Sequence, residues 1–568
     1  MVSTGHYLAA ASGFRILEQG GNATDAGVAA GITINVVLPQ WTSFGGVAPI
    51  LIHDAGRNET VSISGLGRWS KTASIDYFNQ HHGGSLPPGV PRTVTPAAAD
   101  AWITALRLYG TMSFEQVVGP ALEIAEKGFP VPASLHSALG RAGDQLTADV
   151  SGDTNWPSTT EIFFRDGEPL RTGDILVQSD LARTFRRLIE VERDHTTQGR
   201  EDALQAARDF FYKGEIAKEI VRWVQDKGGF LTMEDMAEFS VGVEPPTMGT
   251  YKGIDLYTCG AWCQGPINIQ MLQMLENFDL RGMGHNSADY MHTLLETFKL
   301  VFGDREAYYG DPDFVNVPLQ ALLSKAYADE RGRAIDPFRA YPEMPEPGNP
   351  WPHQGMTALN ERPARPKAAS GSLQADTSYA CVVDRWGNAF SATPSDTLSH
   401  APVAKGLGFV VSARGSQSWL DPEHPSALEP GKRPRLTPNP ALAMRNGKVW
   451  MPFGTPGGDI QCQSMVQLFL NVAEFGMDIQ QAVEAPRVST WSFPNSFWPH
   501  AYNPGLVGVE GRIDSQAAAD LARRGHKVEV WDDFMARMGC LCAIEVDQER
   551  GGLNGGADPR RDAYAVGR

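Results

Sequence analysis

Thr377 lies where a chain cleavage could convert it into a catalytic amino terminus. The segment around it, ADTSYACVVDRWGNAFSATPSDT, runs from Ala375 to Thr397. A threonine hydroxyl is a weak nucleophile at neutral pH, but a free α-amine, with a pKa of roughly 7.7 to 8.0, can act as its base. Strand-forming residues at 379–383, a turn at 384–388 and a second short strand at 389–393 predict a hairpin with Thr377 at its head. On its own this pattern is also typical of any threonine that precedes a strand.

The elements expected to position this segment alternate between helices and strands. Residues 7–18 predict a helix that ends at Gly20 and Gly21. Asn22 then fits the N-cap, and Asp25 the N3 position, of a second helix. That helix is so rich in alanine and glycine that it must pack closely against its neighbours.

Several further segments along the whole chain have a distinctive sequence. They are residues 1–4, EQGGNATDAGVAA (18–30), the pair Gly45 and Gly46, YGTMSFEQVVGPALEIAEKGFPV (109–131), FYKGEIA (211–217), MLENFDLRGMG (274–284), GDREAYYGDPDFVNVP (303–318), KRPRLTPNPAL (432–442) and TPGGD (455–459). Composition alone does not produce so many spaced segments in a fixed order. Together with the threonine segment, they show that the chain resembles the γ-glutamyltransferase family from end to end.

The resemblance implies an N-terminal-nucleophile hydrolase of the α+β class, a four-layer αββα sandwich made as one precursor that cuts itself. The cut would fall between Asp376 and Thr377, giving a heterodimer of residues 1–376 and 377–568, which could itself pair into a dimer of heterodimers. A length of 568 residues alone suggests two or more domains, whereas the resemblance implies one shared core. The proline-rich stretch at 336–376 predicts a mobile linker, with an ordinary surface loop as the alternative.

The resemblance also assigns catalytic roles. Thr377 would attack its own preceding carbonyl and later a substrate amide, forming an acyl-enzyme that water or an amine resolves. Ser395 matches the hydroxyl that assists the nucleophile, where relatives commonly have threonine. The backbone N–H groups of Gly457 and Gly458 would stabilise the tetrahedral intermediate. A plain tight turn is the alternative interpretation of this glycine pair.

The positions that would contact the acyl group depart from the family. Relatives bind the α-amino and α-carboxylate groups of a γ-glutamyl substrate with Asn, Gln and Asp, two consecutive serines, and an arginine of the large fragment. The residues at the matching positions here are Thr397, Arg414, Gln417, Leu436 and Thr437, and the candidate for the large-fragment arginine is Arg68.

The acid that would pair with an ammonium group is therefore missing, and an arginine has been added. Arg414 suggests a pocket for a carboxylate or another anion, because a guanidinium binds such groups through two parallel hydrogen bonds. The alternative for Arg414 is a solvent-exposed loop arginine. The alternatives for Arg68 are Gly67 and Trp69.

Three functions are compatible with these residues. The first, which the missing acid favours, is an amidohydrolase or acylase for a small-molecule amide whose acyl group lacks the usual α-amino group, such as oxamate or a glutaryl side chain. The second is a conventional γ-glutamyl hydrolase or transpeptidase acting on glutathione. The third is a non-catalytic binding protein on the same fold.

Net charge, pI and the distribution of apolar residues limit the classes of partner and the cellular compartment that we expect. The net charge of −17 and the sequence pI of about 5.3 argue against nucleic acid or an anionic membrane surface as a partner. No window approaches the roughly 18 to 20 apolar residues of a membrane span, and the amino terminus has no basic start followed by an apolar stretch. We therefore expect a cytoplasmic enzyme, or a periplasmic or secreted one if a leader has been trimmed.

Neither a metal nor a cofactor is expected. The cysteines are too few and too scattered for a disulfide framework and predict buried thiols; they are Cys259, Cys263, Cys381, Cys462, Cys540 and Cys542. His285, His292 and Glu296 lie on or beside a predicted helix at 287–302, whose apolar residues follow helical spacing and indicate an ordinary buried face rather than a metal site. SGLGRW (64–69) lacks the third glycine of a dinucleotide-binding loop.

Overall fold

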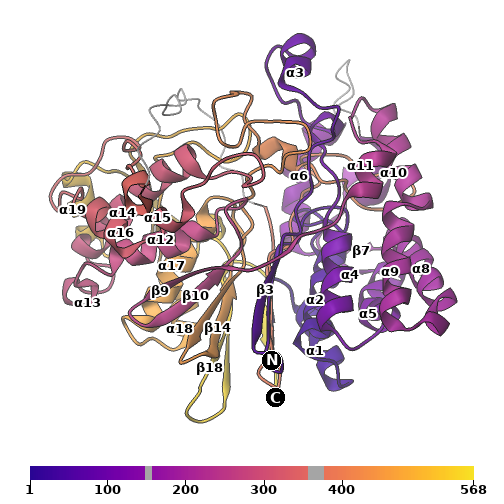
Figure 1. Cartoon of the computed structure of the whole chain (residues 1–568), viewed down its shortest axis with the longest axis horizontal. Coiled ribbons are helices and arrows are strands. Elements are labelled where there is room, and N and C mark those ends of the chain that lie inside the picture. Colours follow the sequence, from indigo (N-terminus) through magenta and orange to yellow (C-terminus); the bar gives the residue numbers. More distant parts are fainter. Residues whose placement is uncertain (148–155, 356–375) are drawn as a thin grey trace.

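The computed structural model describes residues 1–147, 156–355 and 376–568, which form four layers in the order helices, sheet, sheet, helices (Figure 1). The first sheet contains seven strands in the order β20 (Tyr564–Val566), β1 (Val2–Thr4), β11 (Ala380–Val383), β12 (Ala389–Ala392), β2 (Ile50–Asp54), β3 (Glu59–Ile63) and β8 (Val243–Glu244). The second contains six, in the order β19 (Leu553–Ala557), β18 (Cys542–Val546), β14 (Lys448–Gly454), β13 (Ala441–Arg445), β10 (Ile254–Thr258) and β9 (Thr247–Tyr251). This is the αββα sandwich of the predicted fold class.

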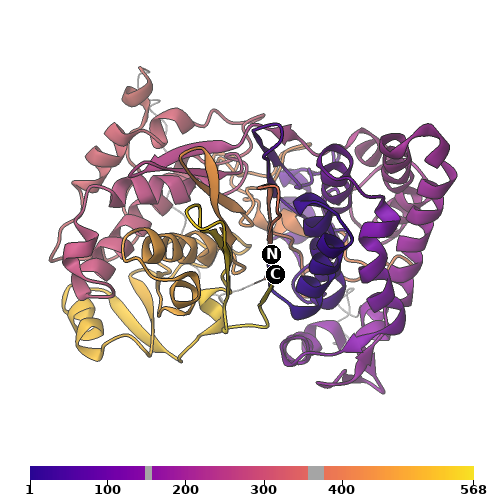
Figure 2. The same cartoon turned by 90° about the horizontal axis from the view of Figure 1, so that it is seen from below.

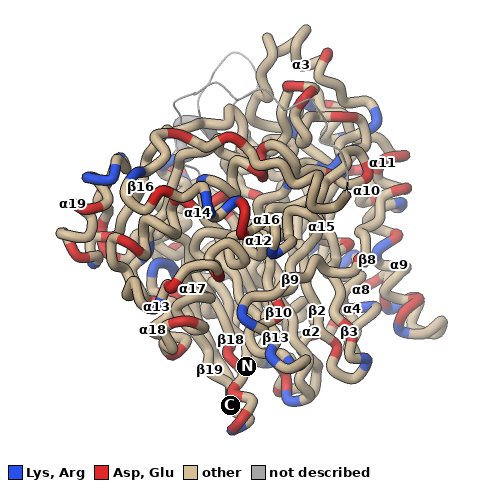
Figure 3. The backbone as a smooth tube through the Cα atoms, turned by 60° about the vertical axis from the view of Figure 1, so that its left-hand side comes forward, with Lys and Arg blue, Asp and Glu red and all other residues tan. Residues whose placement is uncertain are grey.

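Each sheet carries its own helical layer on its outer face. The helices on the outer side of the first sheet are α1 (Tyr7–Glu18), α2 (Ala23–Val37), α4 (Ala98–Tyr109), α5 (Phe114–Lys127), α8 (Ser179–Asp194), α9 (Arg200–Tyr212) and α10 (Glu215–Asp226), of which α1 and α2 pack on its strands. Those on the outer side of the second are α12 (Pro266–Leu275), α14 (Ala288–Tyr308), α16 (Lys325–Gly332), α17 (Ile460–Ala473) and α18 (Ile479–Glu484). A separate apolar cluster fills the space between the sheets and includes Leu51, Tyr379, Cys381, Leu442 and Ile544. Lys and Arg residues are interspersed with Asp and Glu residues along the outer elements (Figure 3).

Each sheet contains strands from both sides of position 376. The hairpin of β11 and β12 lies between β1 and β2, with Val2 opposite Val382 and Ile52 opposite Phe390. The amino- and carboxyl-terminal strands β1 and β20 also pair, so the two chain ends lie side by side (Figure 2). A cut after residue 376 would leave all of these strand pairings in place.

The predicted local elements agree with the structure. The hairpin forms, α1 spans the predicted residues, and Asn22 and Asp25 make a reciprocal capping box at the start of α2. A Cβ atom on Gly27 would lie 2.2 Å from the Phe390 ring, which explains the small residues of α2. The predicted helix at 287–302 is α14, which continues to Tyr308.

The predicted mobile linker is wrong for its first half. Residues 336–355 pack against the second helical layer: the Ala340 N–H donates to the Arg524 carbonyl at 2.7 Å, and Trp351 is buried. Prolines are compatible with this packing because the segment pairs through single hydrogen bonds rather than a ladder. The rest of the predicted linker, up to residue 375, lies outside the described residues. Among the helices of the described part, none has the length and apolar content to span a membrane.

Candidate active site

Thr377 is fully buried at the head of the hairpin, between the two sheets. Its hydroxyl lies 2.7 Å from the Ser395 hydroxyl and donates to Asp376 Oδ1 at 3.0 Å. The Thr377 N–H donates to the Trp41 carbonyl at 3.1 Å. Its φ of 88° is unfavourable for a β-branched residue and costs on the order of 1–3 kcal/mol. The backbone is therefore strained at the predicted cleavage site.

Ser395 is held in position by the segment that contains Gly45 and Gly46. Its backbone N–H donates to the Val47 carbonyl at 2.9 Å, and its carbonyl accepts from the Val47 N–H at 3.2 Å. A Cβ atom on Gly46 would lie 2.3 Å from the Ser395 carbonyl oxygen. Glycine at position 46 thus permits the close approach that places the Ser395 hydroxyl beside Thr377.

The predicted oxyanion loop contacts the bond that would be cut. The Gly457 N–H donates to the Asp376 carbonyl oxygen at 3.1 Å. Gly457 and Gly458 have φ values of 128° and 61°, so the turn requires residues without a side chain. The turn leads into the amino terminus of α17, where the helix dipole favours negative charge. These features match what a developing oxyanion on the Asp376 carbonyl requires.

Buried polar side chains that the sequence analysis did not assign hold this loop. Gln264 Nε2 donates to the carbonyls of Gly458 and Thr437, both at 2.9 Å. Arg305 Nη1 donates to Asp459 Oδ1 at 2.5 Å. The side chains of Arg305 and Asp459 are fully buried. Both residues lie in segments that carry the family resemblance, 303–318 and 455–459, and this was the available signal.

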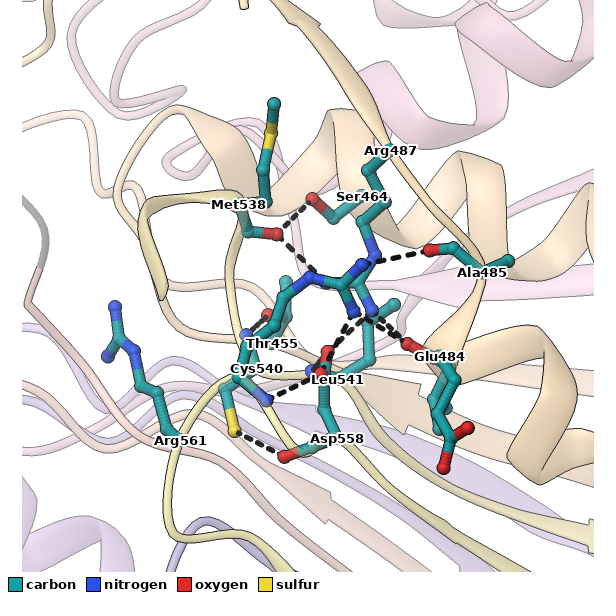
Figure 4. Close-up of polar contacts among 12 residues, drawn as sticks. Thr455, Ser464, Glu484, Ala485, Arg487, Met538, Cys540, Leu541, Asp558 and Arg561 are labelled. Carbon is teal, nitrogen blue, oxygen red and sulfur yellow. Dashed lines mark hydrogen bonds and ion pairs between the residues drawn. The ribbon is translucent and has the colours of Figure 1, made fainter. Parts of the chain in front are cut away.

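A second network supports the loop from behind (Figure 4). The Cys540 N–H donates to Thr455 Oγ1 at 2.7 Å, which connects the start of the loop to the segment before β18. Arg487 then fixes that segment, donating to the Met538 carbonyl at 3.0 Å and to Asp558 Oδ2 at 2.5 Å. The glycine turn is therefore held in place by buried hydrogen bonds.

We expect Gly457→Ala to lower kcat by about 10²-fold or more, the usual cost of losing an oxyanion donor. The added Cβ would lie 2.6 Å from Ile460 Cγ2 and would strain the backbone, so the loop must shift. The matched control is Gly447→Ala, another left-handed glycine (φ 71°) whose Cβ meets nothing within 4 Å. A loss in Gly457→Ala no larger than in the control would contradict the assigned role.

Arg414 is completely buried, which excludes the solvent-exposed alternative. Its guanidinium lies beside Asp376 and Ser395. Its Nη2 donates to Asp376 Oδ2 at 2.5 Å and contacts the Ser395 hydroxyl. Its Nε lies 3.6 Å from Asp396 Oδ1, and the guanidinium stands 5.3 Å from the centre of the Phe497 ring. Nε and Nη1 have no hydrogen-bond partner within the described part of the chain. The arginine is positioned to bind a carboxylate next to Thr377.

Asp396 is another buried residue near Thr377 that the sequence did not single out. It is fully buried with a φ of 111°, and its carboxylate accepts from the Ser412 hydroxyl at 2.8 Å and from the Ala413 N–H at 3.0 Å. Burial raises the pKa of Asp396, while the Arg414 charge opposes that shift. Because both carboxylate oxygens are already engaged, Asp396 orients Arg414 rather than offering a free acid to an ammonium group.

The arrangement can cleave its own backbone. Attack of Thr377 Oγ1 on the Asp376 carbonyl would break the peptide C–N bond and form an ester, with the oxyanion facing the Gly457 N–H. The Asp376 carboxylate accepts the Thr377 hydroxyl and can take its proton, which then passes to the departing Thr377 amine. Water would open the ester and leave Thr377 with a free α-amine.

Comparison with known proteins agrees with this site. Residues 9–568 match the model of the gamma-glutamyltranspeptidase family. The chain is 30% identical over 582 residues to the glutathione hydrolase proenzyme of Bacillus subtilis (strain 168), covering 100% of this chain and 91% of that protein. The chain belongs to the gamma-glutamyltranspeptidase family. This membership makes it an amide hydrolase or acyl-transfer enzyme rather than a non-catalytic binding protein.

Solved structures of similar proteins cover the whole chain. LmbA2991HD is 35% identical with a TM-score of 0.91, and the match covers 100% of this chain and 98% of that one. The cephalosporin acylase from Bacillus halodurans is 28% identical with a TM-score of 0.85, covering 100% and 95% respectively. The relatives of this gamma-glutamyltranspeptidase family member therefore include both a glutathione hydrolase and an acylase.

The other residues predicted to bind substrate have different surroundings. Gln417 and Thr437 meet each other, with Gln417 Nε2 donating to Thr437 Oγ1 at 2.8 Å. The Thr437 carbonyl accepts from Gln264, which also holds the glycine turn. Thr397 is buried, and its hydroxyl pairs with that of Ser399 at 2.9 Å.

Arg68, the candidate for the family's large-fragment arginine, lies elsewhere. Its guanidinium forms ion pairs with two acidic residues: Nη2 donates to Asp313 Oδ2 at 2.9 Å, and Nη1 lies 3.6 Å from Asp311 Oδ2. The alternative residue Trp69 faces the Arg414 turn instead, because its Nε1 donates to the Ser418 hydroxyl at 2.8 Å. The structure thus gives no contact between Arg68 and the atoms around Thr377.

The segment 412–430 forms a packed cover beside the site. Trp419 lies between two histidine rings, with its ring centre 4.2 Å from that of His424 and 3.8 Å from that of His500. Burial lowers the pKa of both histidines to about 4, and the pKa of the nearby His400 to about 3. All three rings are therefore neutral in the folded enzyme at neutral pH.

We expect the melting temperature to fall as the pH is lowered from 6.5 towards 4.5. The three histidines take up protons at an ordinary pKa of 6.5 when unfolded but only near 3 to 4 when folded, so the unfolded chain binds more protons in this range. Thermal melts at half-unit steps of pH measure the slope, and His500→Gln should reduce it. A flat profile, or an unchanged slope in the variant, would contradict this account.

The cysteines and the histidines singled out in the sequence have the following surroundings. All six cysteines are buried and free, as predicted. His285 contacts Asn471, whereas His292 and Glu296 meet His526 in a buried cluster. Lys299 Nζ lies in that cluster, 2.7 Å from Glu296 Oε1, and supplies its positive charge.

Proposed function

We propose that this enzyme cuts itself before Thr377 and then hydrolyses amides through a threonyl acyl-enzyme, with acyl groups that carry a carboxylate but no α-amino group. The buried Arg414 is the observation that carries the proposal. It already binds one oxygen of the Asp376 carboxylate, and the other oxygen of that carboxylate lies 3.0 Å from the Thr377 hydroxyl. Ser395 assists the nucleophile and the glycine turn binds the oxyanion. Water or an amine then releases the acyl group.

The charges around the site support an anionic acyl group. Arg414 contacts both Asp396 and Asp376, and a shift of the new chain end at Asp376 after the cut would leave the second contact open. An incoming carboxylate restores the charge balance. An incoming ammonium would be buried beside a guanidinium with no free acid, which is costly.

The test compares two substrates that differ only in the α-amino group, glutaryl-p-nitroanilide and γ-glutamyl-p-nitroanilide. We expect kcat/KM of the cut enzyme to be higher for the glutaryl substrate by about tenfold or more, since an unpaired buried polar group lowers transition-state binding strongly. Equal values, or a preference for the γ-glutamyl substrate, would favour the conventional activity that the name of the glutathione hydrolase relative describes.

A further inference from the structure

Asp376 occupies the position that a substrate acyl group would take. Its backbone carbonyl oxygen accepts from the Gly457 N–H at 3.1 Å, as a reacting amide carbonyl would. Its side-chain carboxylate lies at the other end of the pocket, on Arg414 at 2.5 Å. Asp376 is buried, so this placement is set by the protein interior rather than by solvent.

The covalent structure of aspartate fixes the separation of these two groups. Two carbon atoms, Cα and Cβ, lie between the carbonyl carbon and the carboxylate carbon, so the residue presents a four-carbon diacid unit with one end as an amide. Each end already has its hydrogen-bond donors. A substrate with the same separation would meet Gly457 and Arg414 without any rearrangement of the site.

Two hydroxyl groups of the site also contact the Asp376 carboxylate. Asp376 Oδ1 accepts from the Thr377 hydroxyl at 3.0 Å, and Oδ2 lies 3.4 Å from the Ser395 hydroxyl. Asp396 forms an ion pair with the same arginine, with its Oδ1 3.6 Å from Arg414 Nε. Arg414, Ser395 and Thr377 therefore all contact the one carboxylate of Asp376.

We propose that the acyl site selects half-amides of four-carbon dicarboxylic acids. In the uncut chain, Asp376 occupies the acyl site with the same separation between its carbonyl and its carboxylate. This inference rests on the proposed function and specifies its substrate class. The Thr377 hydroxyl adds to the amide carbonyl, the C–N bond breaks, and the amine leaves with the hydroxyl proton. Water then hydrolyses the succinyl ester, releasing the diacid and restoring the hydroxyl.

The experiment measures kcat/KM of the cut wild-type enzyme for oxalyl-, succinyl-, glutaryl- and γ-glutamyl-p-nitroanilide. We expect succinyl to exceed both oxalyl and glutaryl by about tenfold or more, because even one misplaced methylene costs that much in a fitted site. A glutaryl or oxalyl rate equal to or above the succinyl rate overturns the chain-length inference alone. A γ-glutamyl rate above all three overturns the proposed function itself.

Self-cleavage provides a second readout on the same geometry. Asp376→Glu moves the carboxylate one methylene further from the carbonyl, and we expect self-cleavage to slow by about tenfold. Cleavage of Asp376→Glu at the wild-type rate would contradict the inference. If the variant does not fold, the substrate series with the wild-type enzyme still decides it.

Discussion

Replacing Thr377 with alanine is expected to leave a single uncut chain of 61.7 kDa with no measurable amidase activity. The variant lacks the hydroxyl that lies 2.7 Å from Ser395 and would attack the Asp376 carbonyl. It therefore loses self-cleavage and acyl-enzyme formation together, and the loss of a nucleophile typically lowers kcat by about 10⁴-fold or more. Denaturing electrophoresis and hydrolysis of an anionic p-nitroanilide measure both effects.

Thr377→Ser is the matched control for this substitution. It keeps the hydroxyl and removes only a methyl group, so it should still cut itself and retain part of the activity. A cut and active alanine variant would rule out Thr377 as the nucleophile. A serine variant as inert as alanine would indicate that the threonine acts through packing rather than through its oxygen.

Replacing Arg414 with glutamine is expected to lower kcat/KM for anionic acyl groups by about 100-fold or more. Removing one partner of a buried, hydrogen-bonded charge pair typically costs about 2–5 kcal/mol. The loss should be much smaller for the methyl ester of the same acyl group, because that substrate has no charge to bind. Self-cleavage should also slow, since Arg414 contacts Asp376 in the uncut chain.

Arg385→Gln is a suitable control, since Arg385 is exposed on the turn between β11 and β12. It should match the wild-type enzyme on every substrate. Arg414→Lys retains the charge but not the planar fork, and it should recover only part of the activity. An Arg414→Gln enzyme that loses the charged substrate and its ester equally would show that the arginine supports the fold and does not select the acyl group.

Local sequence signals predicted the fold well where they act over a few residues. Alternating strand residues on either side of Asp384–Asn388 specified the hairpin, and Asn22 with Asp25 specified the start of α2. Thr377, Ser395 and the glycine pair were placed by motif, and the structure brings all of them together around one peptide bond.

Contacts between distant segments were not predictable in the same way. Asp396 differs from an ordinary loop acid only because Ser412 and Ala413 fold back onto it. Gln264 and Arg305 act on the glycine turn from more than 150 residues away in sequence. The direction of Arg68 depends on Asp311 and Asp313, and the packing of residues 336–355 depends on partners such as Arg524. Residue type and local spacing carry no information on such pairings.

The most direct test of the whole account is the intact mass of the purified wild-type protein, followed by amino-terminal sequencing of each species. We expect two fragments that remain associated, the smaller one beginning Thr-Ser-Tyr at Thr377. A stable single chain of 61.7 kDa, or a cut at any other bond, would contradict it, because Thr377 would then lack the free α-amine on which the proposed mechanism depends.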